Sequence, residues 1–214
     1  MLWPNHRVNK DMTMILAIDT STAACSAALF DAAGTCIAHR DELVGRGHAE
    51  RLVPMIGELL DGRTARRILV GVGPGSFTGL RVGIAAAHGL AIGWDAQLMG
   101  MSSLALLAAG ATGETSVAAA MHGGHGELFV QQFEALAPST SFLNLAPAGA
   151  AALISARLVV GPGAADLVES RGSGQAVEAW PRAADALNLP DELRSLAPRP
   201  IYARVPDARA REAA

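Results

Sequence analysis

Hydrophobic and polar positions along this chain follow two patterns, short apolar runs rich in β-branched residues and longer stretches of helical period. The short runs predict buried strands at 14–22, 68–72 and 97–101, with a hairpin formed by 23–30 and 35–40 around a turn at 31–34. The helical pattern predicts helices at 48–60, 78–92 and 102–109. This alternation of strands and helices is typical of a mixed α/β lobe.

A second, smaller lobe follows a Gly-rich, polar stretch at 110–114, which marks the best boundary. We therefore expect a first lobe at 14–110 and a second lobe at 111–197, whose clearest strands are 117–120, 127–133 and 158–160. Residues 137–175 are rich in Ala, Pro, Gly and Ser, and 158–160 is the one firm strand expected there. Residues 1–13 form a polar leader expected to be disordered, with Met14 as an alternative start. Residues 198–214 should pack back on the first lobe.

The Gly-rich turn from Gly73 to Gly79 lies between a predicted strand and a predicted helix, an arrangement that can bind anions. Two phosphate-binding motifs fail here, because the glycine spacing is wrong for a P-loop and no lysine follows. The dinucleotide pattern also fails, because Ser76 and Thr78 stand where glycines are needed. One hypothesis is a tight turn that lets helix and strand pack closely, with Ser76 or Thr78 as the helix N-cap.

The end of the first strand carries an acid and hydroxyls, Asp19-Thr20-Ser21. A first strand that ends this way and runs into a hairpin resembles the start of the actin, sugar-kinase and chaperone ATPases, where such residues face Mg²⁺ and phosphates. The alternative is that these side chains only satisfy amides of the turn. The candidate phosphate-binding residues, vestigial or active, are Asp19, Thr20, Ser21, Gly73, Gly75 and Ser76.

Composition narrows the class of protein. Half of the 214 residues are hydrophobic, 17% are charged and the net charge is −3. A net negative charge does not favour a protein that binds nucleic acid without a partner. Lys10, in the leader, is the only lysine, so lysine-dependent catalysis is improbable. No signal peptide or membrane-length apolar run is visible. In the expected hairpin, Phe30 pairs with Thr35 and Cys36 with Leu29, which separates Cys25 from Cys36 by about 13 Å. Two unpaired thiols predict a cytoplasmic protein.

Three stretches together point to a family: ILAIDTSTAACSAALFD at 15–31, GRGHAERLVPMI at 45–56 and GVGPGSFTGLRVGIAAAHGLAIG at 71–93. With AAMHGGHGELFVQQF at 119–133 and PRPIYAR at 198–204, the chain resembles the TsaB family of tRNA threonylcarbamoyladenosine biosynthesis proteins. The resemblance implies an actin-like, two-lobed fold with ribonuclease-H-like halves. It also implies a non-catalytic subunit that partners the TsaD transferase and the TsaE ATPase, with tRNA reached only through the complex and no membrane contact.

Catalysis and metal binding are not expected. Members of the TsaD family carry His-x-x-x-His after the strand equivalent to 97–101, and this chain has Ser103 and Leu107 there. His122 and His125 lie in a glycine loop without an evident third ligand, and we interpret them as exposed loop residues. No cofactor is expected apart from a weak ATP or ADP contribution at a complex interface. The alternative is a small actin-like ATPase or kinase that uses Asp19, Thr20 and the Gly73–Gly79 turn, and a metallopeptidase is the weakest hypothesis.

The expected partner surface lies on the two helices of the first lobe. Small residues on the second helix allow close approach, and apolar residues on the first supply knobs. The same surface could serve a TsaD-like subunit or a homodimer. The alternative is that these faces are used wholly in the core. The candidate interface residues are His48, Leu52, Met55, Leu59, Arg81, Gly83, Ala86 and Ala87.

Overall fold

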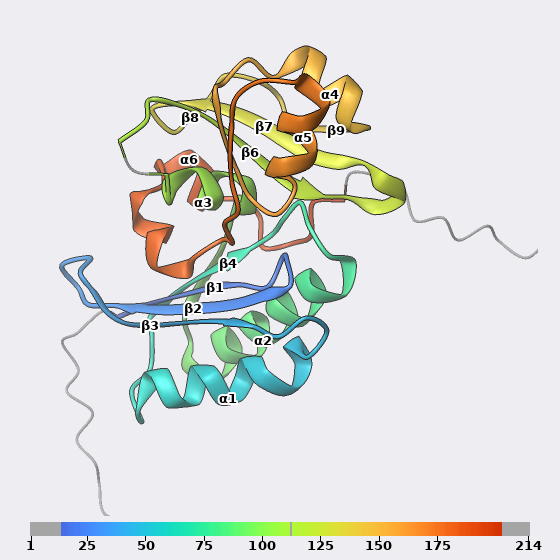
Figure 1. The fold of residues 1–214 in the computed structure, drawn as a ribbon. Coiled ribbons are helices and arrows are strands. Elements are labelled where there is room, and N and C mark those ends of the chain that lie inside the picture. Colours follow the sequence, from blue (N-terminus) through green and yellow to red (C-terminus); the bar gives the residue numbers. More distant parts are fainter. Residues whose placement is uncertain (1–13, 112, 203–214) are drawn as a thin grey trace, which may run out of the picture.

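The computed structural model describes residues 14–111 and 113–202, which form two sheets with helices on either side and between them (Figure 1). The predicted leader and residues 203–214 lie outside this range. The first sheet has the order β3-β2-β1-β4-β5 and the second β11-β10-β6-β7-β8, with β9 also paired to β7. Among the described residues no helix is long and apolar enough to span a membrane.

The first sheet is built from β1 (Ile15–Asp19), β2 (Ala24–Phe30), β3 (Cys36–Leu43), β4 (Arg67–Gly71) and β5 (Gln97–Met101). Strands β1, β4 and β5 are parallel, whereas β2 and β3 are antiparallel to their neighbours. Side chains alternate between the two faces. Leu16 and Ile18 face helices α1 (His48–Leu60) and α2 (Phe77–Trp94), and Ala17 faces the interior between the lobes.

Helix α3 (Ser103–Ala109) lies between the two sheets, and all seven of its residues are buried. A helix that is apolar all round needs cover on every side, and here the sheets and the 3-10 segment η2 (Ala183–Asn188) provide it. The second sheet comprises β6 (Ser116–His122), β7 (Leu128–Glu134), β8 (Ala137–Pro138), β9 (Leu143–Leu145), β10 (Leu158–Val160) and β11 (Gln175–Val177).

The second sheet is covered on its outer face by α4 (Pro147–Leu153) and α5 (Ala164–Arg171). The region 137–175 therefore holds more regular structure than the single strand expected from the sequence. Two short helices were missed because mostly small side chains form their buried faces, which gives a weak hydrophobic pattern. The buried residues are Ala150, Ala164 and Leu167, which pack against the sheet. Between β6 and β7 lies the 3-10 turn η1 (Gly124–Gly126).

The chain returns to the first lobe after β11. The backbone N–H of Ala183 donates to the Ser26 hydroxyl at 2.7 Å, and that of Ser102 donates to the Leu193 carbonyl at 2.9 Å. Helix α6 (Asp191–Arg194) precedes a backbone pair between Leu196 and Gly100. The N–H of Ile201 then donates to the Val72 carbonyl at 2.8 Å. Residues 183–202 therefore pack against the first sheet and its loops.

The register of the β2–β3 hairpin corrects one prediction. Phe30 pairs with Cys36 and Leu29 with Ala38, with an irregularity between Leu29 and Phe30. Thr35 belongs to the turn, because its N–H donates to the Asp31 carboxylate at 2.9 Å and its carbonyl accepts from the Asp31 N–H at 3.0 Å. Cys25 and Cys36 are both free thiols, the first buried and the second exposed.

Candidate functional site

The candidate phosphate-binding residues meet where the carboxyl ends of β1, β4 and β5 lie side by side. Parallel strands bring their following loops to one edge of a sheet, where ligands of α/β proteins commonly bind. Here the loops are Asp19–Ser21 after β1, the Gly73–Gly79 turn after β4, and Ser102–Ser103 after β5. The sequence identified the first two loops.

Asp19 is 1% exposed, and its carboxylate is held by donors from two loops. The N–H and hydroxyl of Ser21 donate to Oδ1 at 2.9 and 2.7 Å, and the Ser103 hydroxyl donates to Oδ2 at 2.7 Å. Burial raises the pKa of Asp19, more than the hydrogen bonds from Ser21 and Ser103 lower it. The acid therefore serves as an internal acceptor that joins the β1 loop to the start of α3.

Thr20 and Ser21 are also directed inward. The Thr20 hydroxyl donates to the Gly79 carbonyl at 2.8 Å, and the Ser21 carbonyl accepts from the Ser76 N–H at 2.7 Å. Both residues are buried. In this arrangement the hydroxyls donate to backbone and carboxylate groups of the protein itself. This is the alternative hypothesis of the sequence analysis, in which these side chains satisfy local polar groups.

The glycines of the turn allow this close packing. A Cβ at Gly75 would lie 2.3 Å from the Ser21 carbonyl oxygen, and one at Gly79 would lie 2.1 Å from the Thr20 carbonyl oxygen. At Gly73, φ is +101°, which a side chain would strain. Ser76 is the N-cap of α2, and its side chain accepts from the Gly79 N–H at 3.2 Å. The turn therefore packs closely against the backbone of the β1 loop.

Ser103 and Gly71 are members of this cluster that the candidate residues did not include. A Cβ at Gly71 would lie 2.0 Å from Asp19 Oδ2, so only glycine at this position leaves room for the Asp19 carboxylate. The available signal was the position of both residues at the ends of predicted parallel strands. That signal places them at the same sheet edge as Asp19.

The candidate interface residues divide into two groups. Arg81 is exposed and Ala86 is partly exposed on α2. The others are buried, with Leu52 and Met55 at 0% and Leu59 at 4%, and they belong to the core between α1, α2 and the first sheet. These apolar knobs therefore cannot form an exposed surface, because the lobe itself uses them. The buried candidates are His48, Leu52, Met55, Leu59, Gly83 and Ala87.

The exposed faces of α1 and α2 follow a different set of positions. Val53 on α1 is 60% exposed, and Phe77 and Ile92 on α2 are 46% and 83% exposed. Along α2, Gly89 and Gly93 have no atom within 4 Å of an added Cβ. Both helices cover the same outer face of the first sheet (Figure 1).

At the start of α2, Arg81 joins the helix to the returning C-terminal segment. Its guanidinium lies 3.5 Å from the centre of the Phe77 ring, and its Nε donates to the Tyr202 hydroxyl at 3.0 Å. The Phe77 and Tyr202 rings are 5.4 Å apart. In the second lobe, His122 pairs with Asp166 at 3.1 Å, with both side chains about half exposed. His122 and His125 are exposed, as expected from the sequence.

Solved structures share this architecture. The chain matches YeaZ from Pseudomonas aeruginosa with a TM-score of 0.72 and 29% identity, over 89% of this chain and 100% of that one. A second structure, titled as an uncharacterized protein with similarity to peptidase YEAZ from Pseudomonas aeruginosa, gives a TM-score of 0.75 and 31% identity over 90% and 100%. The two mixed sheets and their helices define a two-lobed α/β protein.

Sequence comparison gives the family. The model for TsaD, tRNA N6-adenosine threonylcarbamoyltransferase, matches residues 40–172. The Escherichia coli protein TsaB is 43% identical over 128 residues, covering 56% of this chain and 54% of that protein, and Bacillus subtilis TsaB is 37% identical over 100 residues. The chain belongs to the TsaB family, within the group that the TsaD model describes. It aligns with about half the length of the curated relatives it matches.

Proposed function

We propose that this chain acts in the biosynthesis of threonylcarbamoyladenosine in tRNA, as a non-catalytic cytoplasmic subunit that binds a TsaD-like transferase. The names of its curated relatives support the pathway. The subunit role rests on one observation above all, the internal use of Asp19. Asp19 is 1% exposed and accepts three hydrogen bonds from the protein itself, which supports a structural role for this acid over binding of Mg²⁺ or a phosphate.

The region corresponding to the transferase histidine pair supports the same role. The resemblance aligns that pair with Ser103 and Leu107, which are 0% and 2% exposed. Ser103 donates to Asp19, and Leu107 packs in the core between the sheets. Side chains placed this way stabilise the junction of the lobes and offer no metal ligand set.

The proposed partner surface is the exposed face of α1 and α2. Ala49, Val53 and Gly57 are exposed at four-residue spacing on α1, and Arg81, Ala85, Gly89 and Gly93 repeat that spacing on α2. A glycine within a helix costs up to about 1 kcal/mol relative to alanine. Gly89 and Gly93 have no neighbour that requires their small size. Their bare backbone would let a partner helix approach closely, with Ile92 and Val53 as apolar contacts.

The test is co-expression with the TsaD-like subunit of the same organism, followed by sizing and a threonylcarbamoyl-transfer assay. We expect a one-to-one complex, and we expect Ile92→Asp or Val53→Asp to weaken it by about tenfold or more while lowering transfer. Because both side chains are exposed, the variants should stay folded. Leu153→Asp is the matched control, since this 59% exposed leucine lies on α4 of the other lobe.

Other results would identify a different role. Absence of a complex, or equal loss with Leu153→Asp, would overturn the proposed surface. ATP hydrolysis by the isolated chain that is abolished by Asp19→Asn would favour the ATPase hypothesis instead. Sizing of the free chain tests whether the same face forms a homodimer, and addition of the TsaE-like ATPase tests the third component.

A further inference from the structure

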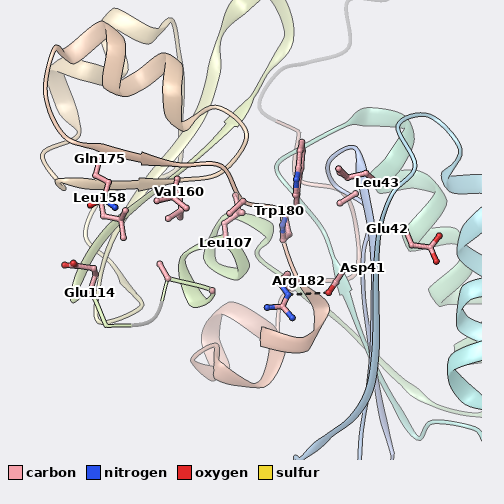
Figure 2. Close-up of a pocket in the computed structure, with 16 residues that line it drawn as sticks. Asp41, Glu42, Leu43, Leu107, Glu114, Leu158, Val160, Gln175, Trp180 and Arg182 are labelled. Atoms are coloured by element: carbon pink, nitrogen blue, oxygen red, sulfur yellow. Dashed lines mark hydrogen bonds and ion pairs between the residues drawn. The ribbon is translucent and has the colours of Figure 1, made fainter.

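A cavity of about 650 Å³ lies between the two lobes, separate from the Asp19 cluster (Figure 2). Its walls come from both sheets, from α3, and from the segment 179–182 that carries the chain back to the first lobe. None of residues 19–21 or 73–76 lines it. A volume of this size is typical of sites for small organic ligands.

The cavity has an aromatic end and an apolar middle. Trp180, which is partly buried, lies between Leu43 of β3 on one side and Leu107 of α3 on the other (Figure 2). Val160 and Leu158 of β10 continue the wall away from Trp180. Leu43 and Val177, which also line the cavity, are 67% and 39% exposed. Exposed apolar side chains that gather at one hollow favour an apolar or aromatic occupant.

The opposite end of the cavity is polar. Glu114 and Gln175 lie there, at the end away from Trp180, and the exposed Glu114 side chain lies at the rim (Figure 2). The lining therefore changes along its length from an indole ring, past leucine and valine, to a carboxylate and an amide. A matching ligand has an apolar body at one end and a polar group at the other.

The charges of the lining indicate the sign of that polar group. Among the described residues that line the cavity, Arg182 is the only basic one, and its Nε lies 3.3 Å from Asp41 Oδ2. Glu42 is held by Arg51 at 2.6 Å, and Figure 2 shows it directed away from the cavity. With these two acids paired, Glu114 supplies the remaining charge, which is negative. A carboxylate at the rim attracts an ammonium group and repels an anion such as a phosphate.

We propose that this cavity binds a small organic cation of the arylalkylamine type. Its aromatic body lies between Trp180 and the apolar wall of Leu107 and Val160, and its amine lies at the rim beside Glu114 and Gln175. A bound ligand of this kind contacts both lobes and the segment that joins them. This inference is independent of the proposed role in tRNA modification, because it uses neither the Asp19 cluster nor the exposed faces of α1 and α2.

Three probes with similar bodies test the proposal: phenethylamine, phenethyl alcohol and 3-phenylpropionate. Trp3 and Trp94 are the other two tryptophans, so the double variant Trp3→Phe/Trp94→Phe leaves Trp180 as the reporter of binding. We expect a saturable change in Trp180 fluorescence, strongest for the amine and weakest for the carboxylate. An exposed ion pair with Glu114 predicts a two- to fivefold preference, roughly, for amine over alcohol.

Two variants separate charge from shape. Glu114→Gln should remove the preference for the amine while leaving the affinity for the alcohol unchanged, and Glu169→Gln on α5 is the control acid outside the cavity. Ala111→Phe, at a partly exposed lining position, should fill the space and weaken all three probes by about tenfold. Circular dichroism checks that each variant is folded.

The proposal is overturned if the amine shows no saturation up to about 10 mM, well above the millimolar affinity that a few contacts give. It is also overturned if 3-phenylpropionate binds as tightly as phenethylamine. Retention of full amine affinity by Ala111→Phe would place the binding elsewhere. Loss of the TsaD-like complex in the earlier test leaves these outcomes unaffected.

Discussion

Replacement of Asp19 by Asn and by Ala tests whether this acid is a structural acceptor. Alanine removes the acceptor of three donors, namely the N–H and hydroxyl of Ser21 and the hydroxyl of Ser103. Each buried donor without an acceptor costs about 1–3 kcal/mol. Because the two hydroxyls can rotate toward other acceptors, we expect Asp19→Ala to lower the free energy of unfolding by about 3 kcal/mol, a large part of a typical total.

Asparagine keeps the size of the side chain and one oxygen toward Ser21, while its NH₂ group can donate to the Ser103 hydroxyl. Burial raises the pKa of Asp19 above 3.8 in the folded protein. The folded state therefore binds this proton more tightly than the unfolded chain, and wild-type stability falls as pH rises from 3.8 toward the raised pKa. Asn does not titrate, so the stability of Asp19→Asn relative to wild type should increase across that window.

Urea unfolding followed by circular dichroism, from about pH 4 to about pH 8, measures all three proteins. Other titrating groups are common to wild type and variant, so their contributions cancel in the difference. A difference between wild type and Asp19→Asn that stays constant with pH would refute the reasoning. So would an alanine variant as stable as the asparagine variant.

Two further predictions concern α2 and the thiols. Gly83→Ala would place a Cβ 2.3 Å from the Thr20 hydroxyl oxygen and should destabilise the protein by about 1–3 kcal/mol. Gly89→Ala, on the open side of the same helix, should stabilise the protein by roughly 0.5–1 kcal/mol. Urea unfolding that gives the opposite order of stability would contradict the packing described for α2. Burial raises the pKa of Cys25 to about 11, and Cys36 is exposed, so a thiol reagent near neutral pH should modify Cys36 in the native protein and both cysteines in urea. Equal reaction of both thiols in the native state would show that the first sheet opens readily.

Much of the first lobe could be predicted from the sequence, because local patterns determine its elements. Helix α1 begins and ends at the predicted residues, His48 and Leu60, and β5 matches the predicted 97–101. Ser76, one of two N-cap candidates, caps α2. In these places the apolar periodicity, a capping hydroxyl and glycines at the ends of elements all indicated the same element boundaries.

The direction in which side chains face could be predicted less well. Leu52, Met55 and Leu59 have the spacing of one helical face, but a sequence does not state whether that face meets its own sheet or another protein. The Asp19 cluster posed a similar difficulty. Its acid and hydroxyls were visible, but their partners Ser103 and Gly71 are 84 and 52 positions away along the chain, and only the sheet order brings them together. The hairpin register depended on the Asp31 side chain, which extends the turn by one residue.

The return of residues 183–202 to the first sheet makes the second lobe an insertion within the first. On a ribosome, the first lobe would lack the contact of η2 with β2 and the Leu196 pairing at β5 until residues 183–196 had been made. The two lobes therefore cannot mature one after the other as independent units. A fragment that ends after α3, near residue 111, would lack η2 and the second sheet, which cover α3 and the inner face of the first sheet, so expression of the first lobe alone should yield an aggregation-prone product.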